Sequence, residues 1–216
     1  MNLSEALLTL MFALLYKEAP YIEESVKPQH LQHKEDVTII RDIYISLTDN
    51  PQLESTIVDS AILAAVGFRE SRYRQNGPDG DPIYVSGCKG TNCKRGNSIG
   101  PHQISKGAPF WVKNWESSES WMFEKWQGIN IENLRDPSTN ISFSYDLLKI
   151  YKNKCGGGPS VWLSSYGAGR CINLKKTSGE VNIRCKIVDG FVDKLSELTN
   201  IEKLSGSCKA GYQTAK

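Results

Sequence analysis

The stretch AILAAVGFRESRY, residues 61–73, ends an apolar helical row with an acidic side chain. Ile62 and Val66 lie one helical turn apart, and Glu70 follows one turn further along the same face. A carboxyl group on such a face loses water, and the loss of water favours its protonated form. The sequence therefore predicts a helix that packs its apolar face and ends in a candidate acid.

The composition is that of an ordinary globular chain. The protein has 216 residues, of which 39% are hydrophobic and 23% are charged, values typical of neither disorder nor a membrane protein. This length suits one domain, or one domain with a small appendage, and can bury a sizeable core. The formal net charge of +2 is too small to indicate a nucleic-acid partner, although a mildly basic surface suits an acidic polymer.

The cysteines are more informative than the totals. They are six in number and none forms a Cys-x-x-Cys pair, so the spacing of a zinc site is absent. We interpret them as disulfides of a protein from an oxidising compartment; the alternative is free thiols in the cytosol. Six cysteines allow 15 pairings, and we expect the sequential one: Cys88 with Cys93, Cys155 with Cys171, and Cys185 with Cys208.

The N-terminus carries an apolar stretch over 6–15 that is too short to span a bilayer. Glu5 stands where a signal peptide has positive charge, and no small-residue cleavage site follows. We therefore expect a packed helix of the mature protein, with a signal peptide removed ahead of Met1. The predicted stripe comprises Leu3, Leu7, Leu10, Met11, Leu14 and Leu15.

Helical periodicity recurs along the chain, whereas no series of alternating strands is visible, so the predicted fold class is mainly α. A small β-hairpin is expected between 80 and 100, within a long loop over 76–100, and the tail 203–216 is expected to be loop. Helices are predicted over 1–17, 34–50, 51–73, 136–151, 161–166 and 181–198. Gly167 is expected to end the helix at 161–166.

Five short motifs follow one another in a particular order. They are FRES at 68–71, SIGPHQIS at 98–105, DPSTNI at 136–141, SSYGAG at 164–169 and FVDKL at 191–195. In this order they resemble the soluble lytic transglycosylase and goose-type lysozyme superfamily, over about residues 55–198. The resemblance implies a single lysozyme-like domain, with an N-terminal helical layer (1–50), a catalytic core (51–200) and a C-terminal tail (201–216).

The loop between Glu70 and Gly100 is long for the superfamily and is stapled by the expected Cys88–Cys93 pair. The chain also departs from the superfamily pattern at two further places. Pro101 and His102 replace the usual Leu-Met before the glutamine, and Gly167 replaces the usual asparagine after the tyrosine. Both departures fall where the superfamily lines its sugar groove.

The resemblance also implies roles for particular side chains. Glu70 would be the general acid that protonates the leaving oxygen and could later act as base. Tyr166 would hold the Glu70 carboxyl group by a hydrogen bond, and Gln103 would contact the sugar. Ser71 would be structural or would orient the site, and His102 would touch sugar or peptide. The alternatives are a solvated helix-end glutamate, a buried tyrosine, a turn glutamine and an incidental histidine.

A second carboxylate decides between two outcomes of the reaction. Asp79 and Asp81 follow Glu70 roughly where a goose-type enzyme holds its water, whereas Ser105 occupies the other goose-type position. The alternative is that both aspartates only make turns. Without a second carboxylate the substrate's own hydroxyl attacks and leaves a 1,6-anhydro sugar. Of the two outcomes, we favour hydrolysis.

The expected function is that of a peptidoglycan-cleaving glycosidase. Its bond would be the β-1,4 link between N-acetylmuramic acid and N-acetylglucosamine, or modified forms of it. No metal or cofactor is expected, and the partner would be peptidoglycan glycan strands, met by a monomer in the periplasm or outside the cell. No nucleic acid and no integral membrane segment are expected. The alternatives are a lytic transglycosylase, an inactive glycan-binding relative or inhibitor, and a chitin-degrading relative.

Overall fold

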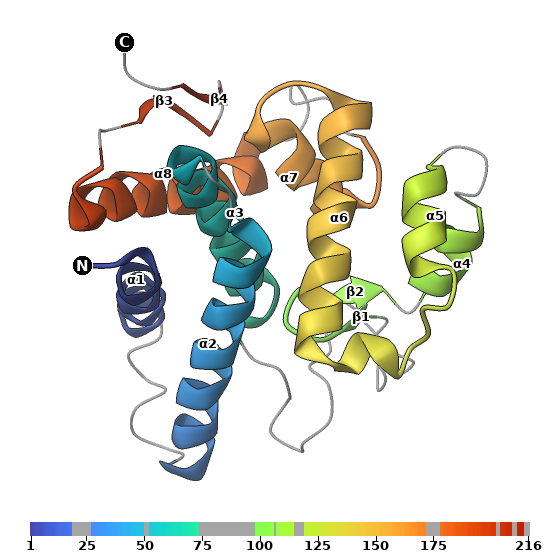
Figure 1. Cartoon of the computed structure of the whole chain (residues 1–216), viewed down its shortest axis with the longest axis horizontal. Helices are drawn as coiled ribbons and strands as arrows, with labels where there is room; N and C mark the ends of the chain where they lie inside the picture. Colours follow the sequence, from blue (N-terminus) through green and yellow to red (C-terminus); the bar gives the residue numbers. More distant parts are fainter. Residues whose placement is uncertain are drawn as a thin grey trace.

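The structure, a computed structural model, describes residues 1–18, 27–49, 52–73, 98–105, 107–114, 119–171, 178–201, 204–208 and 211–213. These residues are mainly helical (Figure 1), which confirms the predicted class. The helices are α1 (Leu3–Glu18), α2 (Lys27–Thr48), α3 (Leu53–Ser71), α4 (Ala108–Lys113), α5 (Ser120–Trp126), α6 (Pro137–Cys155), α7 (Pro159–Ala168), α8 (Ser178–Thr199) and a 3-10 turn, η3 (Asn133–Arg135). The antiparallel strand pairs are β1 (Ser98–Ile99) with β2 (Ile104–Ser105), and β3 (Ser205–Ser207) with β4 (Gly211–Gln213).

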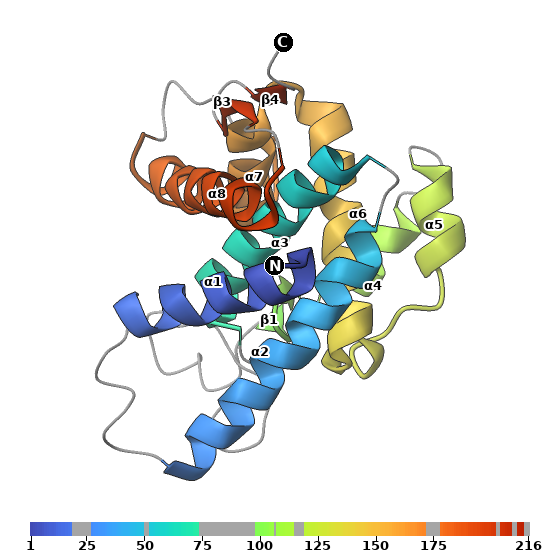
Figure 2. The ribbon, with the colours of Figure 1, turned by 60° about the vertical axis from the view of Figure 1, so that its left-hand side comes forward.

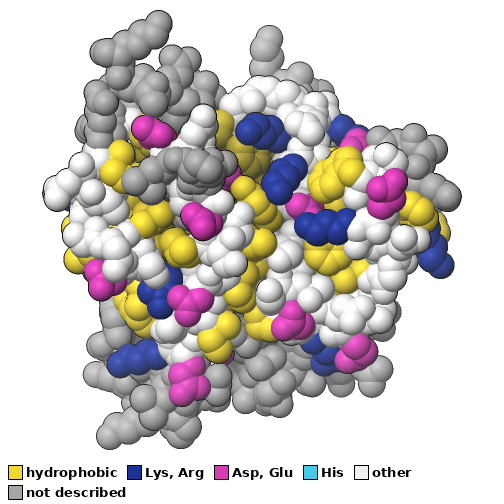
Figure 3. Space-filling view, in the orientation of Figure 1, with side chains coloured by type: hydrophobic (Ala, Val, Ile, Leu, Met, Phe, Trp, Pro, Cys, Tyr) yellow, Lys and Arg dark blue, Asp and Glu magenta, His cyan; other side chains and the backbone are white. Residues whose placement is uncertain are grey.

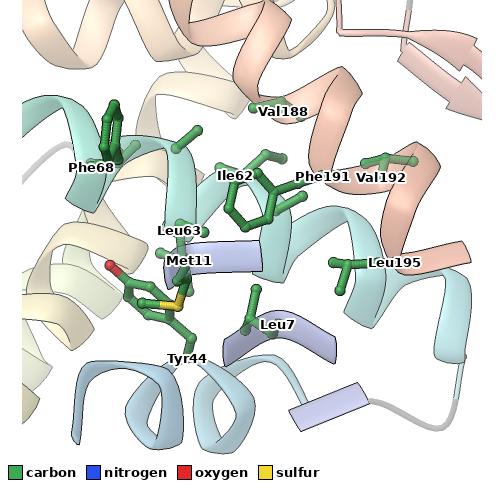
Figure 4. Close-up of a cluster of buried hydrophobic side chains, with 14 of the residues drawn as sticks. Leu7, Met11, Tyr44, Ile62, Leu63, Phe68, Val188, Phe191, Val192 and Leu195 are labelled. Atoms are coloured by element: carbon green, nitrogen blue, oxygen red, sulfur yellow. The ribbon is translucent and has the colours of Figure 1, made fainter. Parts of the chain in front are cut away.

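Helix α3 lies at the centre of the larger apolar cluster. Every residue from 61 to 66 is buried, as expected of a helix that is apolar on most of its circumference. Its neighbours are α1, α2 and α8, and Figure 4 shows Leu63 of α3 in one cluster with Met11 of α1 and Phe191 of α8. Burying each such side chain contributes about 1.5–3 kcal/mol, so these contacts fix the position of α3.

A second, smaller apolar cluster lies under the hairpin β1–β2. Ile99 and Ile104 from the hairpin are buried with Met122 of α5 and Phe143 of α6. The ring of Trp126 meets that of Phe143 edge to face, with centroids 5.2 Å apart. This cluster places the hairpin against α6. The face of the molecule in Figure 3 carries acidic and basic side chains interspersed between apolar ones.

Several predicted boundaries are confirmed and others are wrong. Helix α6 begins as predicted, because the Asp136 side chain accepts a hydrogen bond from the Thr139 backbone N–H at 2.7 Å. Helix α7, in contrast, continues through Gly167 and ends at Gly169, which has a left-handed φ of 65°. Helix α3 begins at Leu53; the predicted cap and first-turn proline, Asn50 and Pro51, lie outside the described residues.

The strands also differ from the prediction. A small hairpin is present: its first strand, at 98–99, lies within the predicted range 80–100, and its second, at 104–105, lies beyond it. Residues 80–97 lie outside the described residues. The tail was expected to be loop, yet it forms the strand pair β3–β4. Cys208 anchors that tail, since its carbonyl accepts a hydrogen bond from the Ser160 N–H at 2.9 Å.

Two of the three predicted disulfides are formed. Cys155 is bonded to Cys171, and Cys185 to Cys208, which fits a protein from an oxidising compartment. The predicted pair of Cys88 and Cys93 lies outside the described residues. In the part of the chain that the structure describes, no helix combines the length and apolarity needed to cross a bilayer.

Candidate functional site

A buried histidine joins three segments that are distant in the sequence. His102 has no exposed surface. Its Nε2 lies 2.8 Å from the Tyr44 hydroxyl of α2, and its Nδ1 lies 2.7 Å from the Ser144 hydroxyl of α6. Its backbone N–H donates to the Asn140 side chain at 3.0 Å. The turn between β1 and β2 is therefore tied to two helices by directional bonds.

Asn140, from the DPSTNI motif, holds the hairpin against α6. Its side-chain NH₂ donates to the carbonyls of Ile99 and Leu134, at 2.8 and 3.0 Å. Gly100 passes directly over this amide with a φ of +73°, and a Cβ there would lie 2.4 Å from the Asn140 nitrogen. The glycine of the SIGPHQIS motif is thus required for close approach as well as for its left-handed backbone.

Tyr166, from the SSYGAG motif, closes the same network. Its hydroxyl donates to the His102 carbonyl at 2.7 Å and accepts from the Ser144 hydroxyl at 3.0 Å. Burial and the nearby negative charge of Glu70 raise the pKa of Tyr166 well above its ordinary value, so it stays a donor. The expectation that Tyr166 holds the Glu70 carboxyl group is wrong in this structure, because the phenol proton is used on His102.

Burial also decides the protonation state of His102. It lowers the pKa of the imidazole from 6.5 to about 3, so the ring is neutral at physiological pH. Both ring nitrogens are engaged by protein hydroxyl groups. The expected contact of His102 with sugar or peptide does not fit this burial; the side chain positions the turn.

Glu70 lies in the last turn of α3 with 16% of its side chain exposed, against a cation rather than a purely apolar wall. Its Oε1 accepts a hydrogen bond from Nη2 of Arg184, on α8, at 2.8 Å. The guanidinium also offsets the negative end of the α3 dipole. The predicted desolvation is therefore accompanied by an ion pair that the sequence did not reveal.

Gly167 makes room for this ion pair. A Cβ at position 167 would lie 2.8 and 2.9 Å from the two terminal nitrogens of Arg184. The glycine at position 167 thus has a physical role, because the guanidinium packs where a side chain would otherwise stand.

The end of α3 has a constrained backbone. Arg72 and Tyr73 both adopt left-handed conformations, with φ of 58° and 57°, and their N–H groups return to the carbonyls of Phe68 and Gly67. Gln103, in the β1–β2 turn, is left-handed as well, with φ of 51°. Such conformations are uncommon outside glycine and concentrate at functional sites.

The remaining predicted side chains make local bonds. The Gln103 side-chain amide donates to the Gly100 carbonyl at 2.8 Å and is 8% exposed. The Ser71 hydroxyl donates to the Gly67 carbonyl at 3.3 Å, and the Ser105 hydroxyl accepts from the Gly107 N–H at 3.1 Å. The two aspartates at positions 79 and 81 lie outside the described residues.

Sequence reasoning missed Arg184, Tyr44 and Ser144. Gly167 was the available signal for Arg184, since a glycine inside a helix often marks a close approach. Tyr44 and Ser144 carried no signal beyond apolar or helical periodicity. Among the described residues, no group of three or more His, Cys, Asp or Glu side chains is arranged to hold a metal ion.

Comparison of the chain with protein-family models, with curated proteins and with solved structures found no match.

Proposed function

We propose that this protein is a peptidoglycan-cleaving glycosidase with a lysozyme-like fold, in which Glu70 is the general acid. The observation that supports this most strongly is the meeting of SIGPHQIS, DPSTNI and SSYGAG in one hydrogen-bonded network. Arg184, which pairs with Glu70, packs against Gly167, the residue after Tyr166 of that network, so the acidic residue of FRES is linked to it. These motifs, which the resemblance assigns to a single reaction, lie together in space, as the residues of one active site must.

The proposed chemistry uses one carboxyl group twice. Protonated Glu70 gives its proton to the oxygen of the leaving sugar and then, as a carboxylate, accepts a proton from the incoming nucleophile. The nucleophile is water in hydrolysis and the substrate's own 6-hydroxyl in the anhydro route. The proposed location is the periplasm or the cell exterior, where peptidoglycan lies and disulfides persist.

Arg184 sets the condition under which Glu70 can act. The guanidinium lies 2.8 Å from the Glu70 carboxyl group and pairs with it. A glycan strand that enters beside the pair would lengthen or open it, which frees the carboxyl group to meet the leaving oxygen. In this proposal Arg184 is a positioning residue and restrains the acid until substrate arrives.

The test of the acid is Glu70→Gln, with Glu197→Gln as a matched control. Glu197 is an exposed carboxylate on α8 that pairs with Lys194. We expect the first variant to release soluble fragments from purified cell walls at least ~100-fold more slowly, as for loss of a general acid, and the second to match the parent. Both should unfold cooperatively. A fully active Glu70→Gln variant contradicts the assignment.

Mass spectrometry of the products distinguishes the two routes. Fragments with reducing ends indicate hydrolysis, whereas fragments lighter by one water indicate the anhydro route. Asp79→Asn and Asp81→Asn, made separately, test whether either carboxylate holds the water. If hydrolysis continues unchanged in both variants, neither aspartate has that role.

The Glu70–Arg184 ion pair favours a second candidate, a glycan-binding relative without catalysis. Arg184→Gln separates the two. For an enzyme, the parent and Arg184→Gln both release fragments from cell walls, but at different rates, because the guanidinium positions the Glu70 carboxyl group. For a binding protein, cell walls bind the protein but no fragments are released at any pH by either form.

A further inference from the structure

Helices α1, α3 and α8 lie close to one another (Figure 2). Residues from all three line a groove on another side of α3. Its volume is about 460 Å³, within the range of pockets that hold one small molecule. Phe68 and Phe191, which are almost fully buried, contribute to its lining, together with Leu10, Leu14 and Ile187. The groove thus offers a mainly apolar surface drawn from three helices.

Three cations accompany this apolar surface. Arg69, Arg72 and Lys186 line the groove, and none of the ten residues that line it is acidic. Arg72 is held in place, since its guanidinium lies 4.1 Å from the centroid of the Phe68 ring and donates to the Phe68 carbonyl at 2.9 Å. An apolar surface with cations at its edge attracts a ligand that carries both a negative charge and an apolar part.

We propose that this groove binds a monomeric single-chain anionic lipid, with its chain on Phe68 and Phe191 and its carboxylate or phosphate head at Arg69 and Lys186. The positive charge of the lining favours an anionic head group, and the volume of the groove accommodates one lipid chain. A protein partner would require an interface of about 1,000 Å² or more, which a pocket of this size does not supply. Neither Glu70 nor Arg184 is among the ten residues that line the groove, so this inference stands without the glycosidase.

The first test compares two probes that share a chain and differ in charge. Isothermal titration of the whole protein uses dodecanoate and dodecyltrimethylammonium, each below the concentration at which it forms micelles. We expect one dodecanoate per protein, bound at least ~10-fold more tightly than the cation, a difference of one favourable charged contact. Equal affinity for the two probes would overturn the proposal.

Gly190 provides a way to fill the groove without disturbing the fold. It lines the groove, and a Cβ added to it meets nothing within 4 Å. Gly190→Leu should therefore project into the open space, weaken dodecanoate at least ~10-fold and leave the melting temperature undiminished, because glycine is a poor helix residue. Unchanged dodecanoate binding in a folded Gly190→Leu protein contradicts the proposed location.

Charge variants complete the experiment. Arg69→Gln combined with Lys186→Gln should weaken dodecanoate about tenfold without weakening the cationic probe. Lys194→Gln, a cation on α8 outside the groove, should bind like the parent. If the protein binds vesicles containing anionic phospholipid but not monomeric dodecanoate, or an acidic amphipathic peptide but not dodecanoate, the proposed ligand class is wrong.

Discussion

The two sides of α3 are held by different physical means. Toward α1 and α8 the contacts are apolar, and the cluster around Met11, Leu63 and Phe191 has no directional requirement (Figure 4). Toward the hairpin and α6, a chain of hydrogen bonds runs through Tyr44 and His102. Apolar packing tolerates small changes of shape, whereas a buried polar network is specific only when every member is satisfied. We call the side of α3 that faces α1 and α8 the apolar side, and the side that faces the hairpin and α6 the polar side. The comparison indicates that the apolar side provides stability and the polar side fixes geometry.

The largest expected effects are on global stability, and they test this division. Leu63→Ala removes a fully buried side chain from the apolar side and should lower the free energy of unfolding by about 3–4 kcal/mol. Asn140→Ala should cost about 3 kcal/mol, because three buried hydrogen bonds lose their partner. Denaturant unfolding measures both values.

Hydrogen exchange then distinguishes the two variants. In Asn140→Ala the His102 amide loses its acceptor, so its exchange should accelerate by more than the fall in global stability. In Leu63→Ala the same amide should accelerate only in proportion to global stability. If both variants affect the His102 amide alike, the two sides of α3 are not separable.

Acid should destabilise the polar side through His102. The pKa of this residue falls from 6.5 to about 3 on folding, so the folded state requires the neutral ring. Its contribution is fully present above pH 6.5 and is lost as the pH falls toward 3. Between pH 7 and pH 4 the loss should be about 3 kcal/mol, at about 1.4 kcal/mol per pKa unit. Unfolding curves at several pH values measure it.

The control for this effect is His102→Gln, whose side chain does not titrate. The variant should be less stable at pH 7 but should lose about 3 kcal/mol less than the parent between pH 7 and pH 4. The carboxylates titrate in both proteins, including Asp59, whose pKa burial raises, and their contribution cancels in the difference. Parallel pH curves for the two proteins would show that His102 is not the acid-sensitive group.

Gly67 forms the join between the two sides, and its substitution should have the next largest effect. A Cβ there would lie 2.1 Å from the Tyr44 hydroxyl and 3.3 Å from Nε2 of His102. Gly67→Ala should therefore cost about 2 kcal/mol, because overpacking outweighs the gain in helix propensity. Gly190→Ala, where a Cβ meets open space, should instead stabilise the protein by about 0.5–1 kcal/mol. A stabilising Gly67→Ala would mean that Tyr44 moves aside freely.

The apolar side was largely predictable from the sequence, because periodicity reports burial directly. The stripe containing Leu7 and Met11 predicted α1, and both residues are fully buried. Asp136 and Pro137 predicted the start of α6, since capping depends on neighbouring residues only. The short strands β3 and β4 escaped prediction because their residues show no alternation, and the anchor at Cys208 is a tertiary contact.

The polar side was predictable in its members but not in their bonds. The sequence contains its motifs, but the hydrogen-bond partner predicted for Tyr166 was wrong, and no ion-pair partner was predicted for Glu70. Glu70 and Arg184 are 114 residues apart, and no local pattern links two charges at such a distance. His102 is similar: the sequence gives a lone histidine in a turn, and only the fold supplies the two hydroxyl groups that keep it buried.

The smallest effect concerns a single hydroxyl group within the polar network. Ser144 contacts both the His102 ring and the Tyr166 phenol, so Ser144→Ala should cost about 1–2 kcal/mol by leaving buried polar groups without a partner. Ser164 is also buried, but its hydroxyl donates only to the Ser160 carbonyl within α7, so Ser164→Ala should cost about 0.5 kcal/mol or less. Thermal and denaturant unfolding of the pair measures the difference. Equal losses of stability in the two variants would show that the hydrogen bonds of Ser144 stabilise the protein no more than the bond of Ser164 within its own helix. The geometry of the polar side would then depend on packing.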